Sequence, residues 1–469
     1  MIITKEMPVE QKNIIGMKAL SGSSVTKLSQ EFGVNRVFVY TQKSRIKEIL
    51  ESEEPYSNIP VVALDQRMIE KIIIAGMLIC KGSTEDIQRF IAEVFGISVS
   101  IGKISSVINE AALTAKRWNE SIDLSTIKIG ANDEIFQGHS PILVGVDPLT
   151  TYTYLLNSAK HRDATTWGTY LLEKEKHQKL HLELSVNDGG LGLQKGVKEA
   201  FPDANIQLDV FHTEYDFSKA VCSAERSAYK DIKIEEKLRI KAEKRGTDKN
   251  IQNYEISVKK ANTSIDVYDK LYLLSHWIRE LLMIGGYTYD EKMELFNYII
   301  FELERFEINN DYLMKSTKFI KGNLGDILRF VKNAEVSLNR LALDESIPVE
   351  ILHKMWKQLG FSHSSAEYNH LEAEIGRSLG CSYDAIHQKF KAILNNTVRA
   401  SSIVECINSL IRPYLFLKKV VPDKFLDLLQ FYFNNRKYRR SRKSERVGKS
   451  PIELLTGMQY PSVLALLGY

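Results

Sequence analysis

The sequence predicts an α+β chain of several domains, in which a small mixed sheet is embedded in helical segments. Three observations predict this class. Apolar residues recur at helical spacing within 1–122, and strand-like alternation is confined to 126–212. From 213 to about 395 the chain is rich in Lys and Glu and lacks any strand pattern. A length of 469 residues, 44% of them hydrophobic, allows two to four domains with buried cores.

The bulk properties exclude several classes of protein. The most apolar stretch, 72–80, is too short to span a bilayer and reads as a core helix, and the N-terminus has no signal-peptide pattern. The cysteines contain no CxxC pair, which fits a reducing cytosol and argues against a zinc site built on Cys. We therefore expect a cytoplasmic protein that has no membrane partner.

The first domain, 1–52, has a helix-turn-helix pattern. Val25, Leu28 and Phe32 fall at helical spacing, and Gly33 stands where a helix end needs a left-handed residue. Asn35 can cap the second helix. In a helix-turn-helix this second helix enters the major groove of DNA, and an ordinary helical hairpin is the alternative. The DNA-contacting candidates are Asn35, Arg36, Tyr40 and Lys43.

A second helix-turn-helix-like domain is expected at 65–122, after a linker at 51–66 that contains two prolines. Ser83 and Asp86 form a capping-box pattern. A Gly96 turn follows, and Ser98 would then begin a helix that carries Lys103, a further DNA-binding candidate. Two such units in series favour a protein that recognises a long DNA site, and a helical packing domain is the alternative.

The segment 123–215 reads as a compact α/β domain. Its strands are expected at 126–136, 141–147, 151–160, 181–188 and 205–212, and its helices at 162–178 and 191–201. The order β-β-β-α-β-α-β is that of an RNase H-like fold. An all-helical insertion at 216–395 would separate this part of the core from a final segment at 396–469.

An RNase H-like core performs its chemistry with carboxylates from the first strand, the end of the fourth strand and a later helix. Asp133 lies on the first strand. Asp188 ends the fourth strand, and Gly189-Gly190 permits a tight turn after it. Glu405 lies one turn into a helix that Ser401 or Ser402 would cap. Carboxylates suit Mg²⁺, a hard cation, and two such ions can cut a phosphodiester.

Other polar residues accompany this predicted triad. Asn408 and Arg412 follow Glu405 on one helix face, as accessory residues or as an ordinary polar face. Asp147 is an alternative first acid, although Asp-Pro is a good turn former by itself. Asp209 is an alternative second acid. The spacing favours Asp133 and Asp188, and the triad Asp147–Asp209–Glu405 stays as the alternative.

Several motifs together resemble a DDE transposase of a bacterial insertion sequence. Asp133-Glu134 resembles the first-acid motif, and Ser158 through Ala164 resembles the strand-to-helix passage that contains an Arg-Asp pair. The stretches SVNDGG and SIVECINSLIR resemble the second-acid and final-acid motifs. Asp209 to His212 is similar to the D-x-x-H motif of Mutator- and hAT-like relatives, which makes Asp209 and His212 accessory residues.

The C-terminal tail supports the same resemblance. The stretch 436–449 carries eight Lys or Arg against one Glu, although the net charge of the whole chain is only +4. Basic residues in such a tail add phosphate contacts to DNA. The DNA-binding candidates of the tail are Arg436, Lys437, Arg439, Arg440, Arg442 and Lys443.

The resemblance implies a transposase that binds the terminal inverted repeats of its element. Asp133, Asp188 and Glu405 would hold Mg²⁺, or Mn²⁺ in its place, and would cut and join DNA strands. Double-stranded DNA and a second copy of the chain are the implied partners, at the bacterial nucleoid. A catalytically inactive, domesticated relative that only binds DNA is the alternative. Trp277 is either a stacking site for an unpaired base or a core residue.

Overall fold

The computed structural model describes residues 7–51, 64–306, 310–417 and 421–469. Most of the predicted linker lies outside these residues. The chain is α+β with a five-stranded sheet, as expected, and divides into two compact units. One unit is Asp123–Ser409, and the other joins Met1–Ile122 to Leu410–Tyr469. The finer division into five domains stays a prediction.

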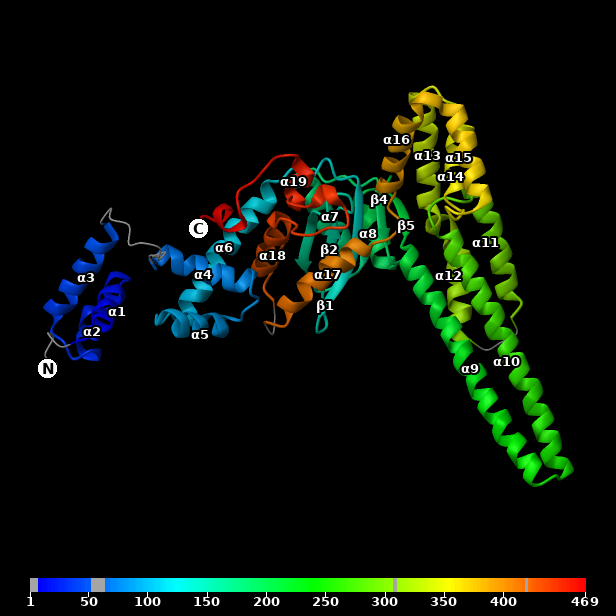
Figure 1. The fold of residues 1–469 in the computed structure, drawn as a ribbon, viewed down its shortest axis with the longest axis horizontal. Coiled ribbons are helices and arrows are strands. Elements are labelled where there is room, and N and C mark those ends of the chain that lie inside the picture. Colours follow the sequence, from blue (N-terminus) through cyan, green and yellow to red (C-terminus); the bar gives the residue numbers. More distant parts are fainter. Residues whose placement is uncertain (1–6, 52–63, 307–309, 418–420) are drawn as a thin grey trace. The chain divides into compact units, whose positions relative to one another are not determined.

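The mixed sheet belongs to the unit Asp123–Ser409 and has the strand order β3-β2-β1-β4-β5 (Figure 1). The pairs β1–β2 and β2–β3 are antiparallel, whereas β1–β4 and β4–β5 are parallel. The strands are β1 Ile129–Gln137, β2 Ser140–Val146, β3 Thr153–Ser158, β4 Leu184–Asn187 and β5 Asn205–Leu208. The last strand is shorter than predicted, because Asp209 begins a helix instead of ending the strand.

Successive residues of β1 point to opposite faces of this sheet. Glu134 faces α7 (Ala164–Gln178), where the indole of Trp167 donates to its carboxylate, Nε1 to Oε1, at 2.9 Å. Asp133 faces α17 (Ser402–Leu415), which supplies Asn408. The sheet is therefore covered by α7 on one face and by α17 on the other.

Two glycines make room for a buried polar contact across the strands. The hydroxyl of Tyr154 on β3 donates to Oδ1 of Asn132 on β1 at 2.5 Å. The tyrosine crosses β2 at Gly145, where an added Cβ would lie 2.4 Å from its ring. Gly130 is equally crowded, with 2.4 Å from a Cβ to the tyrosine hydroxyl. Only glycine leaves room for the tyrosine at these two positions. The hydrogen bond between Tyr154 and Asn132 therefore joins β3 to β1 across β2.

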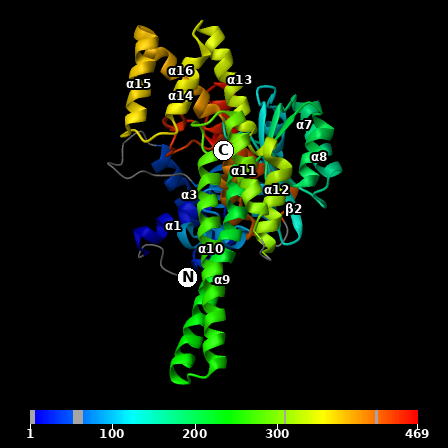
Figure 2. The same cartoon turned by 90° about the vertical axis from the view of Figure 1, so that its right-hand side faces the viewer.

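An all-helical segment follows β5. It begins with two long helices, α9 (Val210–Lys244) and α10 (Asp248–Leu281), which run side by side and reach away from the sheet (Figures 1 and 2). Its core contains Phe296, Phe330 and Trp356. The remaining helices are α11 Tyr289–Glu304, α12 Asp311–Ile327, α13 Arg329–Asp344, α14 Val349–Gln358, α15 Ala366–Leu379 and α16 Tyr383–Asn396. α8 (Leu191–Ala200) lies earlier, between β4 and β5.

The other unit is helical throughout its described part. Several predicted caps are confirmed: Asn35 Oδ1 accepts from the Phe38 amide at 2.7 Å, and Ser83 and Asp86 form a capping box. The helix predicted from Ser98 begins later, because Ser100 is its cap. The helices are α1 Val9–Leu20, α2 Val25–Glu31, α3 Arg36–Glu51, α4 Gln66–Leu78, α5 Thr84–Phe95, α6 Ile101–Ser121, α18 Asp423–Asn435, α19 Pro451–Thr456 and α20 Val463–Leu466.

Membrane-spanning helices are not found among the described residues. None of the helices there combines the length and the apolar character that crossing a bilayer requires.

Candidate active site

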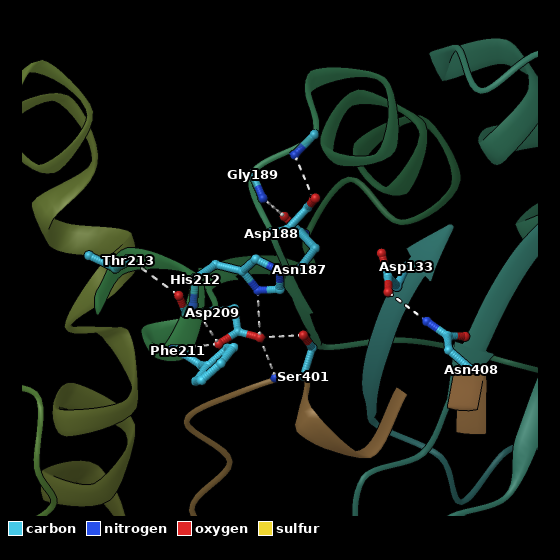
Figure 3. Close-up of polar contacts among 11 residues, drawn as sticks. Asp133, Asn187, Asp188, Gly189, Asp209, Phe211, His212, Thr213, Ser401 and Asn408 are labelled. Carbon is cyan, nitrogen blue, oxygen red and sulfur yellow. Dashed lines mark hydrogen bonds and ion pairs between the residues drawn. The ribbon is translucent and has the colours of Figure 1, made fainter. Parts of the chain in front are cut away.

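Asp133 lies near the middle of β1, opposite Val144 of β2. The Asn408 amide of α17 donates from Nδ2 to its Oδ2 at 2.7 Å (Figure 3). Asn408 is fully buried, so this contact fixes the carboxylate against the helix. Asn408, predicted as an accessory residue of the final-acid helix, thus contacts the predicted first acid directly.

Asp188 follows β4 directly and is exposed. Its Oδ1 accepts from the Gly190 amide at 3.0 Å. Gly189 has φ +97, and a Cβ there would lie 3.3 Å from the Phe319 ring. The turn after Asp188 therefore needs a glycine, as the sequence predicted. Because β1 and β4 are parallel and pair Ala131 with Val186, this register brings Asp188 beside Asp133.

The three predicted acids share one electrostatic environment. The pKa of Asp133 is raised to about 6, mainly by burial and also by the negative charges of Glu405 and Asp188, against a hydrogen bond from the Glu134 backbone and the positive charge of His212. Glu405 lies in the first turn of α17 and is half-buried. Carboxylates from β1, β4 and α17 therefore repel one another across this site.

Asp209 and His212 form a buried ion pair next to this site. Asp209 caps α9 by accepting from the amides of Phe211 and His212 at 2.7 and 3.4 Å. Its Oδ2 lies 3.2 Å from His212 Nδ1 and also accepts from both the amide and the hydroxyl of Ser401 (Figure 3). Ser401 immediately precedes α17, so Asp209 ties the first turn of the Glu405 helix to the start of α9.

The all-helical segment leaves and re-enters the core at this point. The amide of Val210 donates to the Arg399 carbonyl at 3.3 Å, and Gln207 Nε2 donates to the Val398 carbonyl at 2.7 Å. Sequence reasoning named Ser401 only as a helix cap. Its contact with Asp209 spans 192 positions, and no local pattern could have revealed it.

The Arg-Asp passage of the sequence holds the residue next to Asp133. Arg162 lies 3.3 Å from the Glu134 carboxylate, NH1 to Oε2, and Trp167 donates to the other oxygen. Asp163 caps α7. The first-acid motif and the Arg-Asp motif are thus joined through Glu134, a role that the sequence analysis did not assign.

Asp147 has the turn-forming role considered for it. Its carboxylate accepts from the Leu149 and Thr150 amides, both at 3.1 Å, and from the Thr150 hydroxyl at 2.5 Å. It is buried in the turn between β2 and β3. These hydrogen bonds account for the burial of the Asp147 carboxylate without a metal ion.

The remaining candidates lie elsewhere. Arg412 is exposed in the last turn of α17, beyond the residue at which the two units divide. Trp277 is 38% exposed and lies against Tyr298, with ring centroids 6.4 Å apart. Lys103 pairs with Glu70 and Lys437 with Glu453, at 2.8 and 3.0 Å. The exposed DNA-binding candidates are Asn35, Arg36, Tyr40, Lys437, Arg439, Arg440 and Arg442, whereas Lys43, Arg436 and Lys443 are half-buried.

The donor set of this site suits a hard divalent cation. In the described part of the chain, no three His, Cys, Asp or Glu side chains are already gathered as a complete metal cluster. The pKa of Asp133 is raised mainly by burial, and the negative charges of Glu405 and Asp188 add to this effect. Carboxylate oxygens are the ligands that Mg²⁺ prefers, so Asp133, Asp188 and Glu405 fit this ion.

The Asp209–His212 pair should make stability depend on pH. The pKa of His212 is raised to about 9, mainly by the hydrogen bond to Asp209 and also by the charges of Asp209, Asp188 and Asp133, against the opposing effect of burial. Burial alone would raise the pKa of Asp209, but His212 and Ser401 lower it overall. The His212 contribution is therefore complete below about pH 6.5 and is lost as the pH rises through 9, whereas the Asp209 contribution is lost only in acid.

We expect the urea midpoint of unfolding to fall between pH 6.5 and 9.5, and His212→Asn to remove most of that fall. Asp133 loses its own proton near pH 6, below this window. His177→Asn, at an exposed position on α7, is the matched control and should unfold like the wild type. An unchanged slope in His212→Asn would show that the pair does not set the pH dependence.

One comparison with known protein families gives a match. Residues 133–340 match the model of a protein family, DDE_Tnp_ISL3, that is described as a transposase. The match begins at Asp133 and spans β1 to most of α13. No curated protein matches the chain. The family match supports the resemblance of the sequence motifs to the DDE transposases of insertion sequences.

Proposed function

We propose that this transposase relative is a DNA transposase that binds the terminal inverted repeats of its element and cuts and joins DNA strands. The observation that carries the proposal is the shared site of Asp133, Asp188 and Glu405, whose charges act on one another. Three carboxylates facing one another next to a histidine suit phosphodiester chemistry better than a structural role.

Asp133, Asp188 and Glu405 would hold Mg²⁺ or Mn²⁺. These ions would supply charge stabilisation at the phosphate and activation of the attacking oxygen. Water would attack the phosphorus at the transposon end, and the bond to the 3′-oxygen would break to leave a 3′-hydroxyl. This hydroxyl would then attack the phosphorus of a target phosphodiester, and the bond to the target strand's own 3′-oxygen would break to release a 3′-hydroxyl there, so no Ser or Tyr nucleophile is required.

The neighbouring side chains would keep the acids in place. Asn408 donates to Asp133 and so aims its second oxygen toward the site. Asp209 holds Ser401 and thereby the first turn of the helix that carries Glu405. His212, with its raised pKa, would be protonated at neutral pH and would offset part of the negative charge.

Double-stranded DNA is the proposed partner. The helix-turn-helix candidates Asn35, Arg36 and Tyr40 would read bases, and Lys43 and Lys103 would add contacts. The basic tail 436–449 would contact phosphates. Joining two transposon ends requires at least two active sites, so we propose a homodimer or a larger homo-oligomer acting at the bacterial nucleoid.

The test is cleavage and strand transfer on a labelled duplex that carries the terminal repeat flanking the gene. We expect the full-length chain to release a 3′-hydroxyl and join it to a target plasmid in Mg²⁺ or Mn²⁺, and to do neither in EDTA. Binding of the terminal duplex without cleavage in either metal would identify a domesticated DNA-binding relative. Failure to bind any duplex would remove the proposed function altogether.

A further inference from the structure

A basic groove lies at the ends of α7 and α8, away from the ion pair of Asp209 and His212. We call it the α7–α8 groove. Its volume is about 660 Å³, and its walls come from the β1–β2 turn, the loop before α7 and the first turn of α8. Its basic side chains are Lys160, Arg162, Lys195, His139 and His161.

The charge of the α7–α8 groove favours an anion. Lys160, Arg162 and Lys195 contribute three positive charges, against the negative charges of Asp163 in the groove and of Glu134, which pairs with Arg162. The Asp163 carboxylate is already engaged, because it accepts from the amide and hydroxyl of Thr166 at 2.8 and 2.7 Å. The lysines at 160 and 195 are exposed, so both can reach a ligand that lies in the groove.

Backbone groups add to this preference. Gly190 caps α8 without any side-chain hydrogen bond, and the first turn holds no acidic residue, although the Asp188 carboxylate accepts from the Gly190 amide. Gly192 brings this first turn close to the loop before α7, since a Cβ there would lie 2.3 Å from the Arg162 carbonyl oxygen. The basic side chains and the end of α8 therefore face the same space.

Two residues that border the predicted acids in the sequence connect them to the α7–α8 groove. Arg162 contacts Glu134, the residue after Asp133, and also lies over the Phe136 ring at 5.6 Å. Leu191 begins α8 only three residues after Asp188.

We propose that the α7–α8 groove binds the phosphodiester backbone of duplex DNA, without reading the base sequence. This rests on the proposed function and adds a DNA contact within the catalytic unit, separate from the helix-turn-helix candidates and the basic tail. Phosphate contacts of this kind position DNA and carry no sequence information of their own.

The test uses the full-length chain with a labelled random-sequence duplex in EDTA, so that no strand is cut. The affinity is measured at several salt concentrations for the wild type and for the double variant Lys160→Gln/Lys195→Gln. Each phosphate contact contributes about 0.9 to the slope of log affinity against log salt, so we expect the slope to fall by about 1.8. Arg162 is left unchanged because it also holds Glu134.

The matched control is Lys176→Gln/Lys198→Gln, which removes the same charge from the last turns of α7 and α8. Its slope should equal that of the wild type. An equal fall in both double variants, or no fall in the groove variant, would overturn the proposal. A second arm adds ATP as a competitor, since a free nucleotide presents the same phosphate chemistry. Groove-dependent ATP binding as tight as that of DNA would contradict a DNA site.

The outcomes separate this inference from the proposed function. If the wild-type chain cuts terminal duplexes but has the same salt slope as the groove variant, only the proposal about the groove is overturned. If the wild-type chain binds no duplex at any salt concentration, the proposed function itself is overturned.

Discussion

Replacing Asp133 by Asn is expected to abolish strand cleavage while DNA binding survives. The substitution keeps the shape of the side chain and can keep the contact with Asn408, but it removes a charge that would hold the metal ion. Metal ions contribute several kcal/mol to such a reaction, so the rate should fall by about a thousandfold or more. The measurement is cleavage of the terminal duplex in Mg²⁺ and in Mn²⁺, with binding followed separately in EDTA.

Asp147→Asn is the matched control for this experiment. It lies on the neighbouring strand end, and its carboxylate is occupied by the turn that follows β2. Losing part of these hydrogen bonds should cost about 1–3 kcal/mol of stability, but the folded protein should cut DNA at nearly the wild-type rate. If Asp147→Asn abolished cleavage and Asp133→Asn did not, the proposed triad would be wrong.

Asp209→Ala is expected to lower both stability and cleavage. It removes the partner of His212, the cap of α9 and the anchor of Ser401 in a single step. Removing one partner of a buried ion pair costs about 3 kcal/mol. Because Ser401 precedes the helix of Glu405, we also expect the folded variant to need a higher Mg²⁺ concentration for half-maximal cleavage.

Asp231→Ala provides the comparison for Asp209. Asp231 is also a buried aspartate of α9, paired with Lys260 at 2.8 Å, but it lies about six turns further along the helix. The Asp231→Ala substitution should lower the free energy of unfolding without changing the Mg²⁺ dependence of cleavage. Asp209→Asn should restore part of the activity, since an amide oxygen can still accept from Ser401. Equal Mg²⁺ curves for the wild type and for both alanine variants would show that Asp209 has no positioning role.

Local patterns predicted much of this molecule because their causes are local. The Gly189 turn after Asp188 and the caps at Asn35 and Ser83 depend on residues within a few positions of one another. Alternating apolar residues likewise placed the five strands. The β5 boundary was wrong, because Asp209 to His212 has strand-like residues but its first carboxylate caps a helix.

Contacts between distant residues could not be predicted in the same way. Asn408 was noted for its spacing from Glu405, yet its bond to Asp133 crosses 275 positions. Trp167 carries no visible sign that its indole donates to Glu134.

The way in which the helical segment is attached has a consequence for evolution. The chain leaves β5 at Asp209 and returns at Ser401, and these two residues are bonded to each other. Gln207 and Val398 close the same junction a step earlier. We call these two contacts, Asp209 with Ser401 and Gln207 with Val398, the clasp. Because this clasp fixes the two ends of the segment, helices between them can be lost, gained or exchanged over generations without displacing Glu405. Lineages that share this clasp should therefore differ widely in the spacing of their second and third acids.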